Sequence, residues 1–226
     1  MSKILVVAAH PDDEILGVGG TVAKHTYNGD HVECLILGEG QTSRWDSRED
    51  VDRTVIEELH KDTWESAEII GYKKVRFADF PDNRFDSVDL LDIVKVIEKV
   101  ISEFQPVIIY THHSGDLNVD HQRTFQAVMT GTRTVNSYPV KELYTFETLS
   151  STEWNFGKKD SFRPNVYIDI EAHLMKKIEA MSKYSSELCE YPHPRSLEGI
   201  KLLAEYRAMT VGKKYVEAFE LIRKVL

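Results

Sequence analysis

The chain of 226 residues is acidic, with a formal net charge of −9 and no basic stripe. This charge excludes a protein that holds a nucleic-acid backbone by electrostatic attraction, because such proteins carry clustered basic residues. Hydrophobic residues make up 42% and charged residues 29% of the chain, so we expect a globular protein in which residues 1–226 form a single domain.

Cysteine usage and hydropathy indicate the compartment. The only two cysteines, Cys34 and Cys189, do not make a disulfide framework, and such usage fits a reducing cytosol. The apolar run before His10 is too short for a signal peptide or a membrane span, and no later run approaches membrane length. We therefore expect a cytoplasmic protein with no membrane span, and small polar substrates stay open.

The first predicted strand, residues 3–8, leads directly into Ala9-His10-Pro11-Asp12-Asp13-Glu14. An uncharged apolar run predicts a buried strand, and the acidic residues after it predict the start of a helix. Acidic residues at a helix start also complement the helix dipole. Capping alone does not require a histidine and three adjacent acids, so we interpret this stretch as part of a functional site.

The spacing within this stretch favours a metal site. His10 and Asp13 are three residues apart, so both can face one point at a helix start. Imidazole and carboxylate are ordinary zinc ligands, and a catalytic zinc needs a third protein ligand and one open position. His121 is the best candidate for that third ligand. Asp12 lies between the first two ligands, which leaves it free to act as a base toward metal-bound water.

Residues 12–28 predict a helix that ends at Asn28-Gly29. Gly17, Gly19 and Gly20 inside it lack the spacing of a dinucleotide-binding motif. Close packing of the helix on the sheet explains these small residues better.

Residues 31–37 predict the second strand, and residues 38–45 form a loop at the same sheet edge as His10. A loop in this place often lines a site. Glu39 and Arg44 are its candidates for substrate contact. The alternative is a solvated loop with incidental charges.

Residues 46–70 predict an amphipathic helix, with a break near Lys61-Asp62 left open. A short third strand follows at residues 74–77. In the next loop, Asp82 is a candidate to accept hydrogen bonds from sugar hydroxyls. The alternative is that Pro81-Asp82-Asn83 is simply good turn chemistry.

Residues 88–103 predict a helix, and residues 107–110 predict the fourth strand. Strands that alternate with helices indicate an α/β fold with a mostly parallel sheet flanked by helices. His121 follows the fourth strand as His10 follows the first. Because ligands bind outside the carboxyl ends of parallel strands, we expect the two histidines to converge at one edge.

The last third of the chain changes character. Residues 141–146 and 166–170 predict strands, and residues 171–183 and 197–210 predict helices, so we expect a smaller C-terminal extension of strands and helices. Ser196 is the predicted N-cap of the last helix. Arg195, directly before it, either binds an anionic group or forms a salt bridge.

Together these motifs resemble the LmbE-like, or PIG-L-like, family of metal-dependent N-deacetylases. The resemblance implies a Rossmann-like sheet, and a zinc site with His10, Asp13 and His121 as ligands and Asp12 as base; iron(II) is the alternative metal. It also implies hydrolysis of an acetamide on an N-acetylated amino sugar or related glycoconjugate. The motifs that carry it are residues 10–14, Gly38-Glu39-Gly40, Pro81-Asp82, Asp120-His121, Pro194-Arg195-Ser196 and residues 215–219.

One position departs from the family pattern. Many members carry a histidine three residues before the last ligand, where this chain has Asn118. An amide donates a hydrogen bond to an oxyanion but cannot protonate a leaving amine. The proton donor therefore stays open between His112, His113 and protonated Asp12. Asp120 either orients a neighbouring group or caps its helix.

Two other functions remain to be distinguished. One is a metal-dependent amidase that acts on a non-sugar substrate. The other is a carbohydrate- or metal-binding module without turnover, which the presence of Asp12 argues against, because binding alone needs no base. The sequence does not decide between a monomer and a homo-oligomer.

Overall fold

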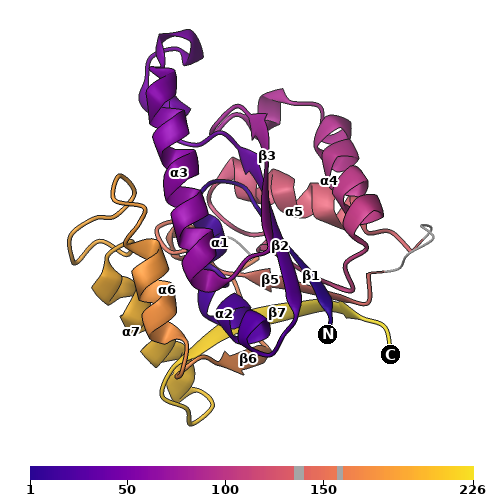
Figure 1. Cartoon of the computed structure of the whole chain (residues 1–226), viewed down its shortest axis with the longest axis vertical. Helices are drawn as coiled ribbons and strands as arrows, with labels where there is room; N and C mark the ends of the chain where they lie inside the picture. The colour runs from indigo at the N-terminus through magenta and orange to yellow at the C-terminus, as the bar shows by residue number, and fades with distance from the viewer. Residues whose placement is uncertain (135–139, 157–159) are drawn as a thin grey trace.

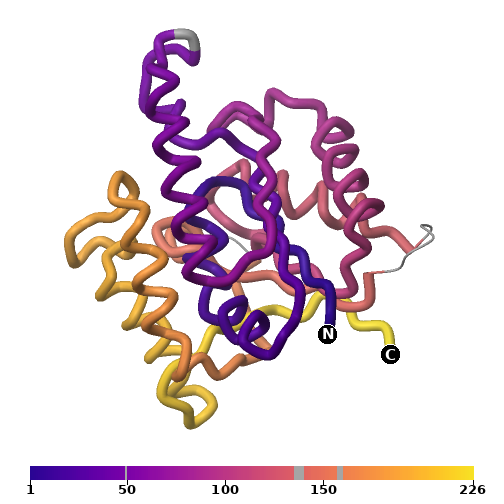
Figure 2. The backbone as a smooth tube through the Cα atoms, viewed as in Figure 1, coloured from indigo at the N-terminus to yellow at the C-terminus, as the bar shows by residue number. Residues whose placement is uncertain are grey.

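The computed structural model describes residues 1–134, 140–156 and 160–226 (Figures 1 and 2). Within these ranges, seven strands form one sheet in the order β3-β2-β1-β4-β5-β7-β6. The strands are β1 Lys3–Ala8, β2 His31–Gly38, β3 Lys74–Phe80, β4 Ile108–His112, β5 Glu142–Phe146, β6 Val166–Asp169 and β7 Val216–Lys224. The α-helices are α1 Asp13–Leu16, α2 Gly19–Tyr27, α3 Arg53–Ile70, α4 Leu90–Phe104, α5 Val119–Gly131, α6 Leu174–Met181 and α7 Leu197–Met209.

The strand order places a crevice at the carboxyl edge of the sheet. Strands β1 to β5 pair in parallel, whereas β7 runs antiparallel to both β5 and β6. The chain builds outward from β1 to β3 and then returns to the other side of β1 as β4. Ligands bind at such a reversal of strand order. The predicted α/β fold with a mostly parallel sheet is confirmed.

Both faces of β1 are buried, which explains its uninterrupted apolar sequence. Ile4, Val6 and Ala8 pack into one core with residues of α1, α2, α3 and α6. The alternate residues, Leu5 and Val7, pack into a second core with residues of α4 and α5. Figure 1 shows these two groups of helices on opposite sides of the sheet.

The helix predicted over residues 12–28 is in fact two helices, α1 and α2, which separate at Gly17-Val18. The glycines there allow close packing, as expected. A Cβ atom on Gly17 would overlap the ring of Phe146, and one on Gly20 would lie 2.8 Å from Ile170. The backbone of this segment therefore lies directly against β5 and the chain after β6.

The predicted start of the next helix, at residue 46, is wrong. Helix α3 begins at Arg53, where the Asp52 side chain caps it by accepting a hydrogen bond from the Thr54 N–H. It then continues without a break to Ile70, so the possible interruption near Lys61 does not occur. Asp52 supplies a stronger start signal than the charge pattern before it.

The sequence did not predict β7, the strand that joins the C-terminal extension to the sheet. Its first residues, Val216 to Phe219, are all buried, so they lack the alternation of a half-exposed strand. Glu217 accepts hydrogen bonds from the N–H groups of Gly20 and Thr21 at the start of α2. It also forms an ion pair of 2.6 Å with Lys177 of α6. This buried group ties the extension to the helices that follow the first strand.

Two further observations concern the helices. Ser196 caps α7 by accepting a hydrogen bond from the Gly199 N–H, as predicted. Among the helices in the described ranges, none is long and apolar enough to cross a membrane.

Candidate active site

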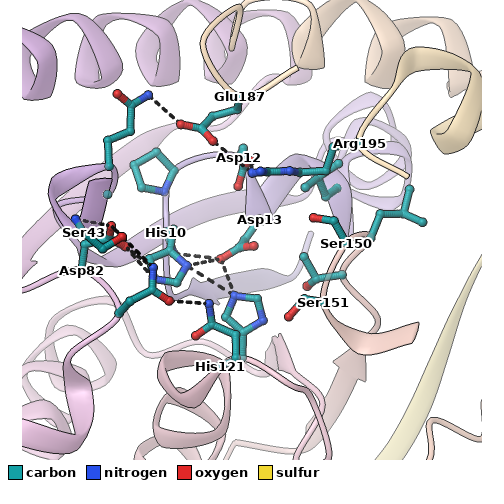
Figure 3. Close-up of a pocket in the computed structure, with 18 of the residues that line it drawn as sticks. His10, Asp12, Asp13, Ser43, Asp82, His121, Ser150, Ser151, Glu187 and Arg195 are labelled. Atoms are coloured by element: carbon teal, nitrogen blue, oxygen red, sulfur yellow. Dashed lines mark hydrogen bonds and ion pairs between the residues drawn. The ribbon is translucent and has the colours of Figure 1, made fainter. Parts of the chain in front are cut away.

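His10, Asp13 and His121 meet at the crevice between the ends of β1 and β4 (Figure 3). Nδ1 of His10 and Nε2 of His121 each lie 3.3 Å from Oδ2 of Asp13. The same two nitrogens lie 3.4 Å from each other. Ligand atoms about 2 Å from a tetrahedral zinc ion lie roughly 3.3 Å apart. The three donor atoms therefore fit a zinc ion, and the fourth position remains for water or substrate.

The electrostatics of these three residues also favour a cation. Burial opposes ionisation of Asp13, but His121, His112 and His10 hold the pKa of its carboxyl group well below the ordinary value. Burial likewise opposes the charge of His121, but the nearby carboxylates of Asp13 and Asp116 raise its pKa to about 9. The nearby carboxylates therefore favour positive charge at the imidazole nitrogens, and a metal ion would supply that charge.

Each candidate histidine ligand has a carboxylate at its far nitrogen. Nε2 of His10 donates to Oδ2 of Asp120 at 2.9 Å. Nδ1 of His121 lies 3.2 Å from Oδ2 of Asp116. Such partners fix the ring orientation and aim the opposite nitrogen at the metal. Asn118, not Asp120, caps α5, because its side chain accepts a hydrogen bond from the Asp120 N–H. The structure thus favours the orienting role for Asp120.

Asp116 was not singled out from the sequence. Its carboxylate is fully buried and accepts hydrogen bonds from the hydroxyl groups of Ser151 and Thr152. The charge of His121 and these hydrogen bonds lower the pKa of Asp116, although its burial opposes ionisation. The sequence did offer one signal for Asp116, because its carboxylate lies in the loop that leads into His121, the last candidate ligand.

Asp12 has an unusual backbone conformation for a residue other than glycine. Its φ of 104° and ψ of −32° lie outside the ordinary regions for an L-amino acid. Strained residues of this kind concentrate at functional sites. Burial, followed by the negative charges of Asp13 and Glu187, raises the pKa of the Asp12 carboxyl group, while Arg195 opposes the rise. Asp12 is thus a buried carboxyl group directly beside the candidate ligands.

These residues line a cavity of about 220 Å³ at the crevice. This volume is small for a ligand pocket, which suits a compact group rather than a polymer chain. Among the described residues, its lining includes His10, Pro11, Asp12, Asp13, Gln41, Ser43, Arg44, Asp82, Asn83, Asn118, His121, Thr148, Ser150, Ser151, Glu187 and Arg195.

Three of the four predicted substrate contacts, Arg44, Asp82 and Arg195, line this cavity. Oδ1 of Asp82 lies 3.3 Å from Nε2 of His10. The fourth, Glu39, does not reach the cavity, because its carboxylate is held by Arg48 through two hydrogen bonds of 2.8 Å. The loop after β2 therefore brings its arginine, but not its glutamate, to the site.

Glu187 is a cavity residue that no sequence motif indicated. Arg44 contacts its carboxylate at 2.6 Å and Arg195 at 3.0 Å. Arg195 also lies 3.4 Å from Oδ2 of Asp12 (Figure 3). The salt-bridge interpretation of Arg195 is confirmed, and its binding of an anionic group stays a prediction.

His112, the last residue of β4, and His113 after it are not placed to protonate a leaving amine. His112 is fully buried, and its Nε2 accepts a hydrogen bond of 2.9 Å from the Ala9 N–H. Its ring stacks on that of His121 at 3.9 Å, and burial together with His121 lowers its pKa to about 3. Both ring nitrogens of His113 are already hydrogen-bonded, Nδ1 to the Glu220 carboxylate and Nε2 to the Asp160 carbonyl oxygen. Neither is among the described residues that line the cavity.

Asn118 does line the cavity. Its side-chain oxygen caps α5, and its Nδ2 donates to Oδ1 of Asn83 at 2.9 Å. An amide nitrogen carries two hydrogens, so one remains for a ligand. The predicted oxyanion donor therefore has a fixed orientation at the site.

Comparison with known proteins gives the family. The model of the PIG-L family, described as GlcNAc-PI de-N-acetylase, matches residues 5–131. An uncharacterised deacetylase of Escherichia coli, YaiS, is 26% identical over 81% of this chain and 90% of its own length. Diacetylchitobiose deacetylase of Thermococcus kodakarensis is 24% identical over 98% of this chain and 84% of its own length.

The fold is shared with solved structures. The zinc-inhibited form of teicoplanin deacetylase Orf2 superimposes with a TM-score of 0.78 over 96% of this chain and 97% of the other, at 16% identity. At that identity the likeness shows the fold alone. The family match, in contrast, covers more than half of the chain and includes all three candidate ligands. The protein therefore belongs to the PIG-L family of deacetylases.

Proposed function

We propose that the protein is a zinc-dependent hydrolase that removes the N-acetyl group from an N-acetylated amino sugar, or from a glycoconjugate that carries one, and releases acetate. The observation that carries this proposal is the position of Asp12. It is a buried carboxyl group on the residue beside Asp13, and it lines the same cavity as the three candidate ligands. A site that only binds metal or sugar needs no such base.

His10, Asp13 and His121 would hold the metal, with zinc as the expected ion and iron(II) as the alternative. When bound there, the metal would supply Lewis acidity that activates water and polarises the acetyl carbonyl. Asp120 and Asp116 keep the two imidazoles oriented, as their contacts indicate.

The remaining steps fall to the protein's own groups. A carboxylate oxygen of Asp12 takes a proton from the water that attacks the acetyl carbon. The Nδ2 group of Asn118 donates a hydrogen bond to the carbonyl oxygen as negative charge develops on it. When the C–N bond breaks, Asp12 returns its proton to the leaving nitrogen, so that acetate and a free amine result. Asp12 takes both roles because neither His112 nor His113 lines the cavity.

The lining of the cavity and the names of the relatives support the proposed substrate class. Charged and hydrogen-bonding groups, among them Asp82, Arg44 and Arg195, surround the space beside the ligands. Such groups suit the hydroxyls of a sugar. The diacetylchitobiose deacetylase that matches nearly the whole chain is named for a substrate of this kind.

A substrate panel tests the proposal. Protein loaded with zinc or with iron(II) is incubated with N-acetylated amino sugars, their glycosides and non-sugar acetamides, and both acetate and free amine are measured. We expect equal amounts of both products from at least one sugar, and none from metal-stripped protein. Release from non-sugar acetamides alone would instead identify an amidase. Tight sugar binding without release would identify a binding module.

A further inference from the structure

The backbone of Asp12 depends on hydrogen bonds in two directions. Its carbonyl oxygen accepts from the N–H groups of Ile15 and Leu16, the first bonds of α1. Its own N–H points the other way and donates to Oε2 of Glu14 at 3.0 Å. Because Asp12 is buried, this N–H has no access to water in its place. Glu14 therefore satisfies the buried main-chain donor of the residue with the unusual φ.

Glu14 is in turn held from the opposite side of its carboxylate. The Tyr184 hydroxyl donates to Oε1 of Glu14 at 2.5 Å. Glu14 is 2% exposed and Tyr184 is fully buried, so both hydrogen bonds lie inside the protein. A carboxylate that served only the dipole of α1 would need neither contact and would normally face solvent.

Tyr184 comes from the C-terminal extension, just after α6. Arg195, also from the extension, lies 3.4 Å from the Asp12 carboxylate. The extension thus reaches Asp12 twice: through Glu14 to its main chain, and through Arg195 to its side chain. This connection links a segment distant in sequence to the conformation of the proposed base.

We propose that Glu14 and Tyr184 are positioning residues that hold the main chain of Asp12 in the conformation from which its carboxylate serves the reaction. This inference rests on the proposed function for the role of Asp12. Neither residue lines the cavity among the described residues, so each acts through Asp12 and not on the substrate. Reaction rates are sensitive to displacements of about 1 Å in a catalytic group, which makes such support measurable.

Four variants test the inference. Glu14→Ala removes the acceptor for the Asp12 N–H, and we expect kcat to fall about 100-fold with KM little changed. Tyr184→Phe keeps the buried ring and removes only the hydroxyl, so a smaller loss of about tenfold is expected. Glu14→Gln should retain most activity, because its amide oxygen accepts from Asp12 and its amide nitrogen can donate to Tyr184.

Tyr72→Phe is the matched control. The Tyr72 hydroxyl is also buried and also reaches Glu14, but it donates to the main-chain oxygen at 3.3 Å. We expect this variant to keep wild-type kcat. All four variants should retain zinc, because no ligand is changed.

Crystal structures of the same variants give a reading that is independent of activity. In Glu14→Ala the φ of Asp12 should leave positive values, whereas Glu14→Gln and Tyr72→Phe should preserve it. The inference is overturned if Glu14→Ala keeps both the Asp12 conformation and the wild-type kcat, or if Glu14→Gln is as impaired as Glu14→Ala. If the unmodified protein releases acetate from no sugar, the proposed function fails, while the Asp12 conformation still decides this inference.

Discussion

Nε2 of His10 lies 2.9 Å from Oδ2 of Asp120, and this contact leaves Nδ1 of the same ring facing Asp13 and His121. Asp120 is itself fixed, because it also accepts hydrogen bonds from the N–H groups of Asn83 and Phe85. The loop after β3 therefore helps to orient a ligand that follows β1. The candidate metal site depends on three loops at one sheet edge, not on its ligands alone.

The first prediction concerns this orienting carboxylate. Asp120→Asn should weaken zinc binding about 10- to 100-fold, because the imidazole loses a negatively charged partner. Competition with a chelator of known affinity measures the change. Asp82→Asn is the matched comparison, since Asp82 lies farther from the same nitrogen, at 3.3 Å, and its loss should matter less. Equal affinities in Asp120→Asn and the unmodified protein would exclude the orienting role.

The second prediction concerns the base. Asp12→Asn should keep bound zinc but lose about 10²- to 10⁴-fold in kcat, the usual contribution of a positioned base. Elemental analysis and acetate release, measured on the same preparation, separate the two effects. His121→Ala serves as the contrasting variant, because it should lose the metal along with the activity. Near-normal turnover in Asp12→Asn would mean that another group accepts the proton.

How far the sequence predicts this site depends on the distance between the contributing residues along the chain. His10 and Asp13 share one turn, and His121 could be added because parallel strands end at one edge. The contact of Tyr184 with Glu14 joins residues 170 positions apart. No local pattern indicates such a contact, because it depends on how the C-terminal extension packs. No local pattern indicates Glu187 either, because Arg44, its partner, lies 143 positions away.

The fold also divides into elements that local periodicity predicts and elements that depend on distant contacts. Apolar runs in β1 and β2 and the amphipathic pattern of α4 predict these elements well, because periodicity reflects burial directly. Periodicity did not predict the break between α1 and α2, and the close approach of Phe146 and Ile170 to Gly17 and Gly20 there is a tertiary contact that no local pattern indicates. The strand β7 was missed because its first residues are buried by neighbours from distant parts of the chain.

The third prediction concerns Asn118. Removing the amide in Asn118→Ala should raise the transition-state barrier by about 3 kcal/mol, with little change in KM, because an oxyanion donor acts mainly in the transition state. This variant also loses the cap of α5, at a cost of about 1 kcal/mol in stability.

Asn118→Asp separates the two effects. An aspartate keeps the capping oxygen but has no N–H to donate, so it should keep the cap of α5 and still lose activity. Steady-state kinetics and urea unfolding on both variants provide the comparison. The oxyanion role is excluded if Asn118→Asp turns over at the wild-type rate.

The last prediction concerns the partly buried pair of His113 and Glu220, whose side chains meet at 2.8 Å. Burial opposes the charge of His113, but hydrogen bonds to Glu220 and to the Asp160 carbonyl raise its pKa above the ordinary 6.5. Burial also opposes ionisation of Glu220, but the hydrogen bond from His113 lowers its pKa below the ordinary 4.5. Each group is therefore more readily charged in the folded state than in the unfolded state.

The sign of the pH dependence follows from these two shifts. The raised pKa of His113 gives stability that is complete below pH 6.5 and is lost as the pH rises through the folded-state value. The lowered pKa of Glu220 gives stability that is complete above pH 4.5 and is lost as the pH falls through its folded-state value. The pair should contribute most between pH 4.5 and 6.5.

His113→Asn tests this window, because the amide can still donate to Glu220 but carries no charge. Urea unfolding should show the variant to be about 1 kcal/mol less stable than the unmodified protein near pH 5.5, with a smaller difference near pH 9. Since His113 does not line the cavity, the pH profile of kcat should be the same in both proteins. A stability difference that does not vary with pH would contradict the charged pair. A shift in the pH profile of kcat would instead indicate that His113 donates a proton in the reaction.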